Sequence, residues 1–149
     1  MRGGKMNTEE LLAQVGLFRS LNKKHIAQLA RFTMIQQYAP GQVIVRQGDT
    51  GLGLYIIVSG SVEVCKERPG QEPVILNTLG PGQFFGEMAL LDDFPRSATV
   101  SAREPTECLT LTKWQFLAEL ESHPEMALPM LPVLSRRVRD ALQQLEAQV

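Results

Sequence analysis

Residues 84–100 read FFGEMALLDDFPRSATV, and this stretch places Gly86, Glu87 and Arg96 in one short segment. Gly86 has no Cβ, so the backbone there can approach another group closely. The run from Glu87 to Leu91 favours one helical turn, whose first N–H groups lack partners and attract an anion. Arg96 can donate two hydrogen bonds to a phosphate, whereas an ionised Glu87 only accepts them and suits a sugar hydroxyl. The segment therefore predicts a binding site for a sugar phosphate.

On both sides of this segment the sequence divides into short β-type runs. Turn signals such as Pro40-Gly41 and Pro69-Gly70 separate the runs. The expected strands are Met34–Tyr38, Val43–Arg46, Leu54–Val58, Ser61–Lys66, Val74–Leu79, Ala98–Ala102 and Glu107–Leu111. Many short strands at this spacing favour an antiparallel sandwich or barrel, and a jelly roll is one option.

Helical signals precede the β-type runs. Asn7, with Glu10 three residues later, forms a capping-box pattern before a short helix that we expect to end near Gly16. A second helix is expected to begin at Asn22, because Ile26 and the apolar residues after it recur at helical spacing. Two short helices are therefore expected before the first strand.

Helical spacing returns after Thr112. Trp114, Leu117 and Leu120 indicate one helix, and a final helix is expected to become regular only around Pro132, because proline suits a first turn. The final helix carries an apolar stripe formed by Leu134, Val138, Ala141 and Leu145. This stripe is compatible with a lid over a ligand, a dimer seam or packing on the β-region, and the sequence does not separate the three.

These patterns predict an α+β chain that is mainly β, with an antiparallel β-sandwich flanked by N-terminal and C-terminal helices. At 149 residues the chain is long enough for one domain with its own core. We expect a flexible arm at residues 1–6 and a single domain at 7–149. Within that domain, the β-roll is expected at about 33–112 and the C-terminal helices at 113–149.

Composition argues against several classes of partner. Fifteen Lys and Arg against sixteen Asp and Glu give a net charge of −1, so the chain lacks the basic footprint of a nucleic-acid-binding protein. The chain also ends at Val149 without residues for a helix-turn-helix domain, so direct nucleic-acid binding is not expected. No apolar run approaches the ~20 residues of a membrane span, and no apolar stretch of a secretory signal follows Met1–Lys5.

The cysteines and histidines carry no recognisable chemistry in the sequence. Cys65 and Cys108 lie far apart without a CxxC pair, so we expect reduced thiols in a cytoplasmic protein, with a disulfide as the alternative. His25 and His123 also lie far apart, with no His/Glu cluster at ligand spacing. Surface or capping positions and no metal are therefore expected for the histidines. A nucleophile–base pair and a triphosphate-binding loop are not found either, which favours a binding domain over an enzyme.

Residues Phe85–Leu90 followed by Arg96–Val100 resemble the phosphate-binding cassette of cyclic-nucleotide-binding domains. Nine positions separate Glu87 from Arg96, as in kinase regulatory subunits and nucleotide-gated channels, whereas the bacterial catabolite activator has one residue more. The similarity extends in register from roughly Leu17 to Leu145, which is nearly all of the chain. The resemblance implies a jelly-roll β-sandwich and a cyclic purine nucleotide, cAMP or cGMP, as the ligand, with no cofactor.

The resemblance also implies roles for the residues of the cassette. Glu87 is expected to accept a hydrogen bond from the ribose 2′-hydroxyl, with the backbone of Gly86 and Met88 nearby. Arg96 is expected to bind the cyclic phosphate with help from the Ser97 hydroxyl. A polar cap on the following strand is the alternative role of Ser97, and a structural ion pair is the alternative for Glu87 and Arg96. An exposed ion pair stabilises a fold by only about 0–1 kcal/mol, so stability alone is a weak reason for such a pair.

Further contacts implied by the resemblance come from other parts of the chain. The N–H groups at Ala89 and Ala98 are expected to help bind the phosphate. Val64 and Leu76 are expected to form part of the apolar wall beside the purine. Arg137 falls where channels of this family place an arginine near the base. Each of these roles requires the folded chain to bring the residue close to the cassette.

The base preference rests on fewer residues. The catabolite activator contacts adenine through a Thr-Ser pair on its last helix. The matching positions here are Ala141 and Leu142, which lack hydroxyl groups. Either the domain discriminates less strictly between bases, or Arg137 replaces the contact of that pair. A threonine at position 97 favours guanine in kinases activated by cGMP, and Ser97 keeps its hydroxyl without the methyl group. We expect cAMP, and cGMP stays possible.

The expected function is non-catalytic binding of a cyclic nucleotide, coupled to movement of the C-terminal helix. Phosphate contact is expected to pull the cassette inward and to swing the helix at 132–149 toward the base. The competing interpretation is an interaction or dimerisation module with a degenerate or unused pocket. In either case, the C-terminal helix is the expected contact for a second copy of the chain or for an effector protein.

Overall fold

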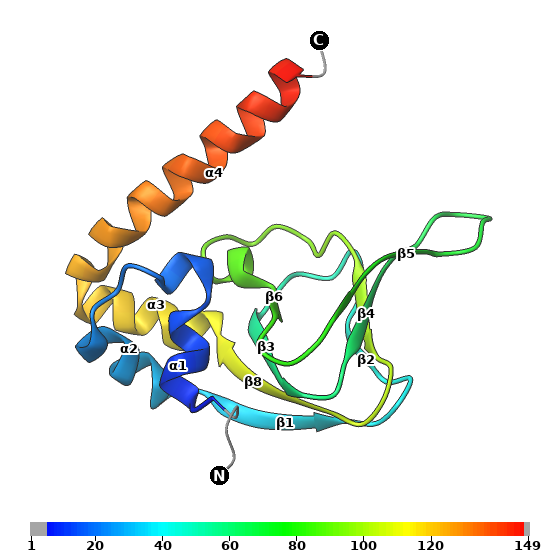
Figure 1. The fold of residues 1–149 in the computed structure, drawn as a ribbon, viewed down its shortest axis with the longest axis horizontal. Coiled ribbons are helices and arrows are strands. Elements are labelled where there is room, and N and C mark those ends of the chain that lie inside the picture. Colours follow the sequence, from blue (N-terminus) through cyan, green and yellow to red (C-terminus); the bar gives the residue numbers. More distant parts are fainter. Residues whose placement is uncertain (1–5, 148–149) are drawn as a thin grey trace.

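Within residues 6–147, the part of the chain that this computed structural model describes, eight strands form two antiparallel sheets (Figure 1). One sheet has the order β1-β8-β3-β6 and the other has the order β2-β7-β4-β5. The strands are β1 (Met34–Tyr38), β2 (Val43–Val45), β3 (Gly53–Ser59), β4 (Val62–Lys66), β5 (Val74–Leu79), β6 (Phe84–Phe85), β7 (Thr99–Ala102) and β8 (Thr106–Thr112). The two sheets confirm the expected jelly-roll-like β-sandwich. Strand β6 was not expected, because two residues are too short to show a period.

Helices stand at both ends of the chain, as expected for an α+β fold that is mainly β. In Figure 1, α1, α2 and α3 gather beside the strands, and α4 extends away from them. The helical elements are α1 (Thr8–Ala13), η1 (Gly16–Phe18), α2 (Lys23–Ala30), η2 (Glu87–Leu90), α3 (Lys113–Ser122), η3 (Pro124–Met126) and α4 (Ala127–Ala147). The η elements are single turns of 3₁₀-helix.

Strand β3 separates two apolar cores because successive side chains of a strand point to opposite faces. Leu54 and Ile56 are buried against the helices, in the same cluster as Phe18 and Phe116. Ile57 is buried in a second cluster together with Val62, Val100 and Cys108. The first core therefore joins the roll to the helices, and Leu90 of η2, which is fully buried, belongs to it.

The first two helices begin where the sequence predicts. The Asn7 side chain accepts a hydrogen bond from the Glu10 N–H at 2.8 Å, and the Glu10 side chain accepts one from the Asn7 N–H at 2.9 Å. This reciprocal pair confirms the capping box. The Asn22 side chain likewise accepts from the His25 N–H at 2.8 Å and caps α2. Both caps satisfy N–H groups that a helix leaves unpaired at its start.

The final helix begins earlier than predicted. Helix α4 begins at Ala127 and continues through Pro132, whereas the sequence predicted a regular helix only from around Pro132. A proline inside a helix removes one backbone hydrogen bond and destabilises it by about 3 kcal/mol. Met130 is buried and Leu134 is partly buried in the first core, so packing on both sides of Pro132 offsets this loss. The prediction was wrong because it weighed the proline without this packing.

Two other expectations about helical residues also need correction. Trp114 is 63% exposed, and Phe116 is the fully buried side chain of α3. The apolar face of α3 therefore comprises Phe116, Leu117 and Leu120. His25, expected at the surface or at a cap, is only 7% exposed on α2, whereas His123 does lie at the C-terminal cap of α3.

The ends of the domain are only partly described. Met6, which was assigned to a flexible N-terminal arm, is partly buried against the first core. Residues 1–5 of that arm and residues 148–149 of the C-terminal helical region lie outside the described residues. Within residues 6–147, no helix combines the length and the apolar character that crossing a membrane requires.

Candidate functional site

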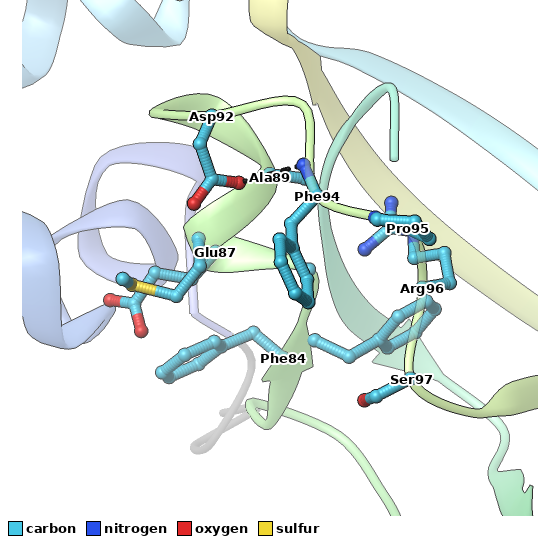
Figure 2. A pocket seen from close by; sticks show the side chains of 11 residues that line it. Phe84, Glu87, Ala89, Asp92, Phe94, Pro95, Arg96 and Ser97 are labelled. Carbon is cyan, nitrogen blue, oxygen red and sulfur yellow. Dashed lines mark hydrogen bonds between the residues drawn. The ribbon is translucent and has the colours of Figure 1, made fainter. Parts of the chain in front are cut away.

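Strand β6, η2 and the loop after η2 line an open cavity of about 470 Å³ (Figure 2). This volume falls in the range of about 300–1,000 Å³ that is typical of small-molecule sites. The lining residues are Phe84, Phe85, Gly86, Glu87, Met88, Ala89, Asp92, Phe94, Pro95, Arg96 and Ser97. Six residues predicted from the sequence therefore line one cavity: Gly86, Glu87, Met88, Ala89, Arg96 and Ser97.

The guanidinium of Arg96 is held in a fixed position beside strand β3. Its Nη2 donates a hydrogen bond to the Gly53 carbonyl oxygen at 2.9 Å, and its central carbon lies 5.8 Å from the centre of the Tyr55 ring. The Tyr55 ring in turn stacks on Phe85 with 4.9 Å between ring centres. Burial lowers the pKa of Arg96 from its usual value, and the neighbouring Tyr55 opposes this effect. Guanidinium has five N–H donors, so several remain for an anion in the cavity.

Gly86 occupies a backbone conformation that favours glycine. Its φ is 83°, in the left-handed region, and it precedes the turn η2. A Cβ at this position would lie 2.5 Å from the Gly53 carbonyl oxygen and would also collide with Arg96. The turn itself uses the Ala89 N–H, which donates to the Gly86 carbonyl oxygen at 3.1 Å. In this structure the 3₁₀ turn therefore takes up the Ala89 N–H, and its contact with a phosphate stays a prediction.

The Glu87 carboxylate faces away from Arg96, toward the N-terminal segment (Figure 2). Its Oε2 accepts a hydrogen bond from the buried Leu17 N–H at 2.6 Å, and its Oε1 lies 2.7 Å from Nη2 of Arg137. Glu87 is itself buried, with 9% of its surface exposed. The expected convergence of Glu87 and Arg96 on one group is thus not found, because two other partners hold the carboxylate.

Arg137 reaches the cassette from α4. Besides its ion pair with Glu87, it donates through Nη1 to the Met88 sulfur at 3.3 Å. The guanidinium also passes over Gly16, where an added Cβ would lie 2.6 Å from Nη2. Arg137 does not border the cavity of Figure 2. The structure therefore pairs Arg137 with the carboxylate rather than placing it at the position expected for a base contact.

Three other predicted residues also lie outside this cavity. Val64 of β4 is partly buried against the core between the sheets, and Leu76 of β5 is 56% exposed. Ala98 is buried directly before β7. The expected wall formed by Val64 and Leu76 does not border the cavity. Phenylalanines of β6 and Phe94 supply its aromatic lining instead.

Several residues near the site had no signal in the sequence. Gly53 and Tyr55 hold Arg96 from strand β3, and Leu17 binds Glu87 from η1, so their roles depend on the folded topology. Lys66 at the end of β4 donates through Nζ to the Ser97 carbonyl oxygen at 2.8 Å. This hydrogen bond brings a second positive charge close to the cassette.

The fold and the cavity together define a ligand-binding β-roll with an arginine suited to an anion. A sequence profile of the cyclic nucleotide-binding domain matches residues 35–123. The chain therefore belongs to the cyclic nucleotide-binding domain family. This result confirms the family resemblance of the cassette.

Individual relatives are regulatory proteins. The chain is 37% identical over 125 residues to the cyclic AMP receptor protein of Thermus thermophilus, covering 84% of this chain and 58% of that protein. It is 40% identical over 111 residues to the cAMP-dependent protein kinase regulatory subunit of Dictyostelium discoideum, covering 72% of this chain and 34% of that protein. The chain thus spans less than two thirds of either relative.

A solved structure shows the same fold over nearly the whole chain. The N-terminal domain of a transcriptional regulator from Streptomyces coelicolor superposes with a TM-score of 0.82 at 28% identity. The superposition covers 91% of this chain and 94% of that domain. The helices and the β-roll therefore recur together in that domain.

Proposed function

We propose that the chain is a non-catalytic sensor of a cyclic purine nucleotide, with cAMP preferred to cGMP. The observation that carries the proposal is the Arg96 guanidinium, fixed by Gly53 and Tyr55 beside a cavity of suitable size. Two relatives with substantial identity are named for cAMP, which supports the choice of adenine. The net charge of −1 is consistent with a small ligand rather than nucleic acid.

The phosphate is assigned to Arg96, because a charge-assisted hydrogen bond contributes about 1.5–3 kcal/mol, more than a neutral one. The exposed Ser97 hydroxyl borders the same cavity and is a second donor. The ribose hydroxyl is assigned to Oε1 of Glu87, which in the structure pairs with Arg137, while Oε2 stays on the Leu17 N–H. A single ligand can therefore contact both Arg96 and Glu87 only after its ribose hydroxyl replaces Arg137 at Oε1.

This exchange is the proposed route from the ligand to α4. The Glu87–Arg137 ion pair connects the cassette directly to the C-terminal helix. A ribose hydroxyl that takes over Oε1 weakens that connection and frees the Arg137 segment of α4 to shift. A ligand moves such an equilibrium only by its differential affinity for the two positions. Loss of a partly exposed ion pair that contributes ~1 kcal/mol changes the equilibrium constant between the two positions of α4 about fivefold.

The alternative function is an interaction or dimerisation module, and one observation favours it. The distal part of α4 extends away from the roll in Figure 1, and it carries exposed apolar residues. These residues are Val138 (59% exposed), Leu142 (52%) and Leu145 (60%). Val138 and Leu145 of the apolar stripe, and the neighbouring Leu142, therefore do not pack on the roll in this structure. A second copy of the chain or an effector protein is the partner that this surface suits.

Calorimetric titration with cAMP and cGMP, with 5′-AMP as a non-cyclic control, tests the sensor proposal. We expect saturable binding with cAMP tighter than cGMP, and a large loss of affinity in Arg96→Gln but not in Arg103→Gln, an arginine outside the cavity. Absence of heat from both cyclic nucleotides, together with self-association through α4, would establish the alternative. The two free cysteines, Cys65 and Cys108, also suit the proposed cytoplasmic setting.

The exchange of partners at Glu87 has its own test. Arg137→Gln removes the competitor for Oε1, so we expect cAMP affinity to rise about fivefold, from the ~1 kcal/mol of such a pair. Arg139→Gln, on the same helix, is the matched control. Weaker cAMP binding in Arg137→Gln would show instead that Arg137 touches the nucleotide, as the family resemblance implies. Hydrogen exchange of α4 that is identical with and without cAMP would exclude the coupling.

A further inference from the structure

Two histidines and a glutamate that are far apart in the sequence meet where α2, α3 and η3 come together. The Nε2 of His25 lies 3.1 Å from Oε2 of Glu125, and the Nδ1 of His123 lies 3.6 Å from the same oxygen. One ligand atom from each residue falls within 4.8 Å of the others. The cluster lies outside the cavity of the cassette and plays no part in the proposed nucleotide site.

The three groups have the chemistry of a metal site, and the two separations that involve Glu125 have its spacing. Two imidazoles and one carboxylate are a ligand set that zinc accepts. Zinc bonds of ~2.0–2.2 Å at tetrahedral angles place neighbouring ligand atoms ~3.2–3.6 Å apart. The two distances to the Glu125 oxygen, 3.1 and 3.6 Å, agree with that spacing to within about 0.1 Å. Three protein ligands would leave one coordination position for water.

Two buried oxygen atoms beside His123 fit the outer contact that a metal-ligating histidine makes. Oε1 of Glu119 is buried without a hydrogen-bond partner and lies 3.9 Å from Nε2 of His123. Oε1 of Gln28 is also buried without a partner, and the same amide approaches Nε2 through its nitrogen at 3.3 Å. A metal bound at Nδ1 of His123 keeps the ring proton on Nε2. The Glu119 carboxylate, or the Gln28 amide with its oxygen and nitrogen exchanged, can then accept a hydrogen bond from this Nε2–H. Ligating histidines commonly make this outer contact.

The partners differ in their access to solvent. The His25 side chain is 9% exposed, whereas those of His123 and Glu125 are 33% and 56% exposed. A cation can therefore enter from the side of Glu125 and reach the buried imidazole last.

We propose that His25, His123 and Glu125 form a binding site for a divalent cation of the zinc type. The site lies directly before Ala127, where α4 begins, so a bound cation would tie α2 to the α3–η3 junction at the base of that helix. The competing explanation is that protonated imidazoles pair with the carboxylates without any metal. This proposal does not depend on the nucleotide proposal, because the two use different residues.

Titration of the untagged chain with Co²⁺, followed by displacement with Zn²⁺, tests the site. We expect one Co²⁺ per chain with visible absorption typical of tetrahedral coordination, and loss of this absorption when Zn²⁺ is added. Glu125→Gln and His123→Gln are expected to weaken the affinity at least tenfold. Because Glu125 is exposed, its substitution keeps the fold even if the histidine variant is destabilised.

Two control variants separate this site from adventitious binding. Glu121→Gln removes an exposed carboxylate of the same helical region, and Cys65→Ser removes the accessible thiol. Both are expected to bind Co²⁺ as the unmodified chain does. Unchanged affinity in Glu125→Gln and His123→Gln would overturn the proposal, as would loss of binding in Cys65→Ser or absence of binding by the unmodified chain. Cyclic nucleotide is left out of this experiment, so its outcome is independent of the sensor.

Discussion

Replacing Glu87 by alanine tests the role of its carboxylate as the junction between the cassette, η1 and α4. The Leu17 N–H is buried and donates to Oε2 at 2.6 Å, so truncation leaves a buried donor unpaired, which costs about 1–3 kcal/mol. Loss of the partly exposed ion pair with Arg137 adds about 0–1 kcal/mol. We therefore expect Glu87→Ala to lower the free energy of unfolding by about 1–4 kcal/mol. For a domain of this size that change corresponds to roughly 2–16 °C in Tm.

Glu87→Gln separates the two contributions. The glutamine oxygen can still accept from the Leu17 N–H, so only the ion pair with Arg137 is lost, and Tm is expected to fall by at most about 2–4 °C. A double-mutant cycle of Glu87→Gln with Arg137→Gln should give a coupling energy of at most about 1 kcal/mol.

Urea unfolding followed by circular dichroism measures each variant, with Glu121→Ala as an exposed control. The reasoning is refuted if Glu87→Ala is within about 0.5 kcal/mol of the unmodified chain, the range of an ordinary surface substitution. It is equally refuted if Glu87→Gln loses as much stability as Glu87→Ala, because the charge and not the hydrogen bond would then dominate.

Three further predictions concern other parts of the molecule. Gly86→Ala should lower Tm and weaken cAMP binding. A left-handed φ costs an alanine about 1–2 kcal/mol, and its Cβ would displace Arg96. Unchanged Tm and affinity would contradict this prediction. Leu90→Ala should destabilise the chain by about 2–5 kcal/mol in urea, because the side chain is fully buried, and a loss below 1 kcal/mol would contradict that packing. Burial raises the pKa of both thiols, that of Cys108 to about 12, but only Cys65 is partly exposed. Iodoacetamide at pH 8 should therefore modify Cys65 and spare Cys108, and mass spectrometry that finds Cys108 modified in the native chain would contradict this.

Local patterns predicted the elements of the fold well. The capping box at Asn7, the cap at Asn22 and the short strands depend on neighbouring residues, and the structure contains each of them. The start of α4 was predicted poorly, because the packing of Met130 and Leu134 that carries the helix through Pro132 involves distant residues.

The candidate site was predictable only where it is continuous in the sequence. Gly86 and Arg96 belong to one cassette and border one cavity, as the pattern predicts. The partners of Glu87 come from η1 and α4, so no local pattern indicates that the carboxylate faces them. The meeting of His25 with His123 is likewise a property of helix packing and not of spacing.

The contact between Arg96 and the nucleotide phosphate is the central claim, and an NMR titration with cAMP tests it most directly. The Arg96 Nε–H resonance and the backbone amides of residues 86–89 and 97–98 should shift together and saturate with one common Kd. Arg96→Gln should abolish these shifts while Arg103→Gln leaves them unchanged. Saturating cAMP that leaves the Arg96 resonance where it was, or that shifts only residues elsewhere in the chain, would contradict the account.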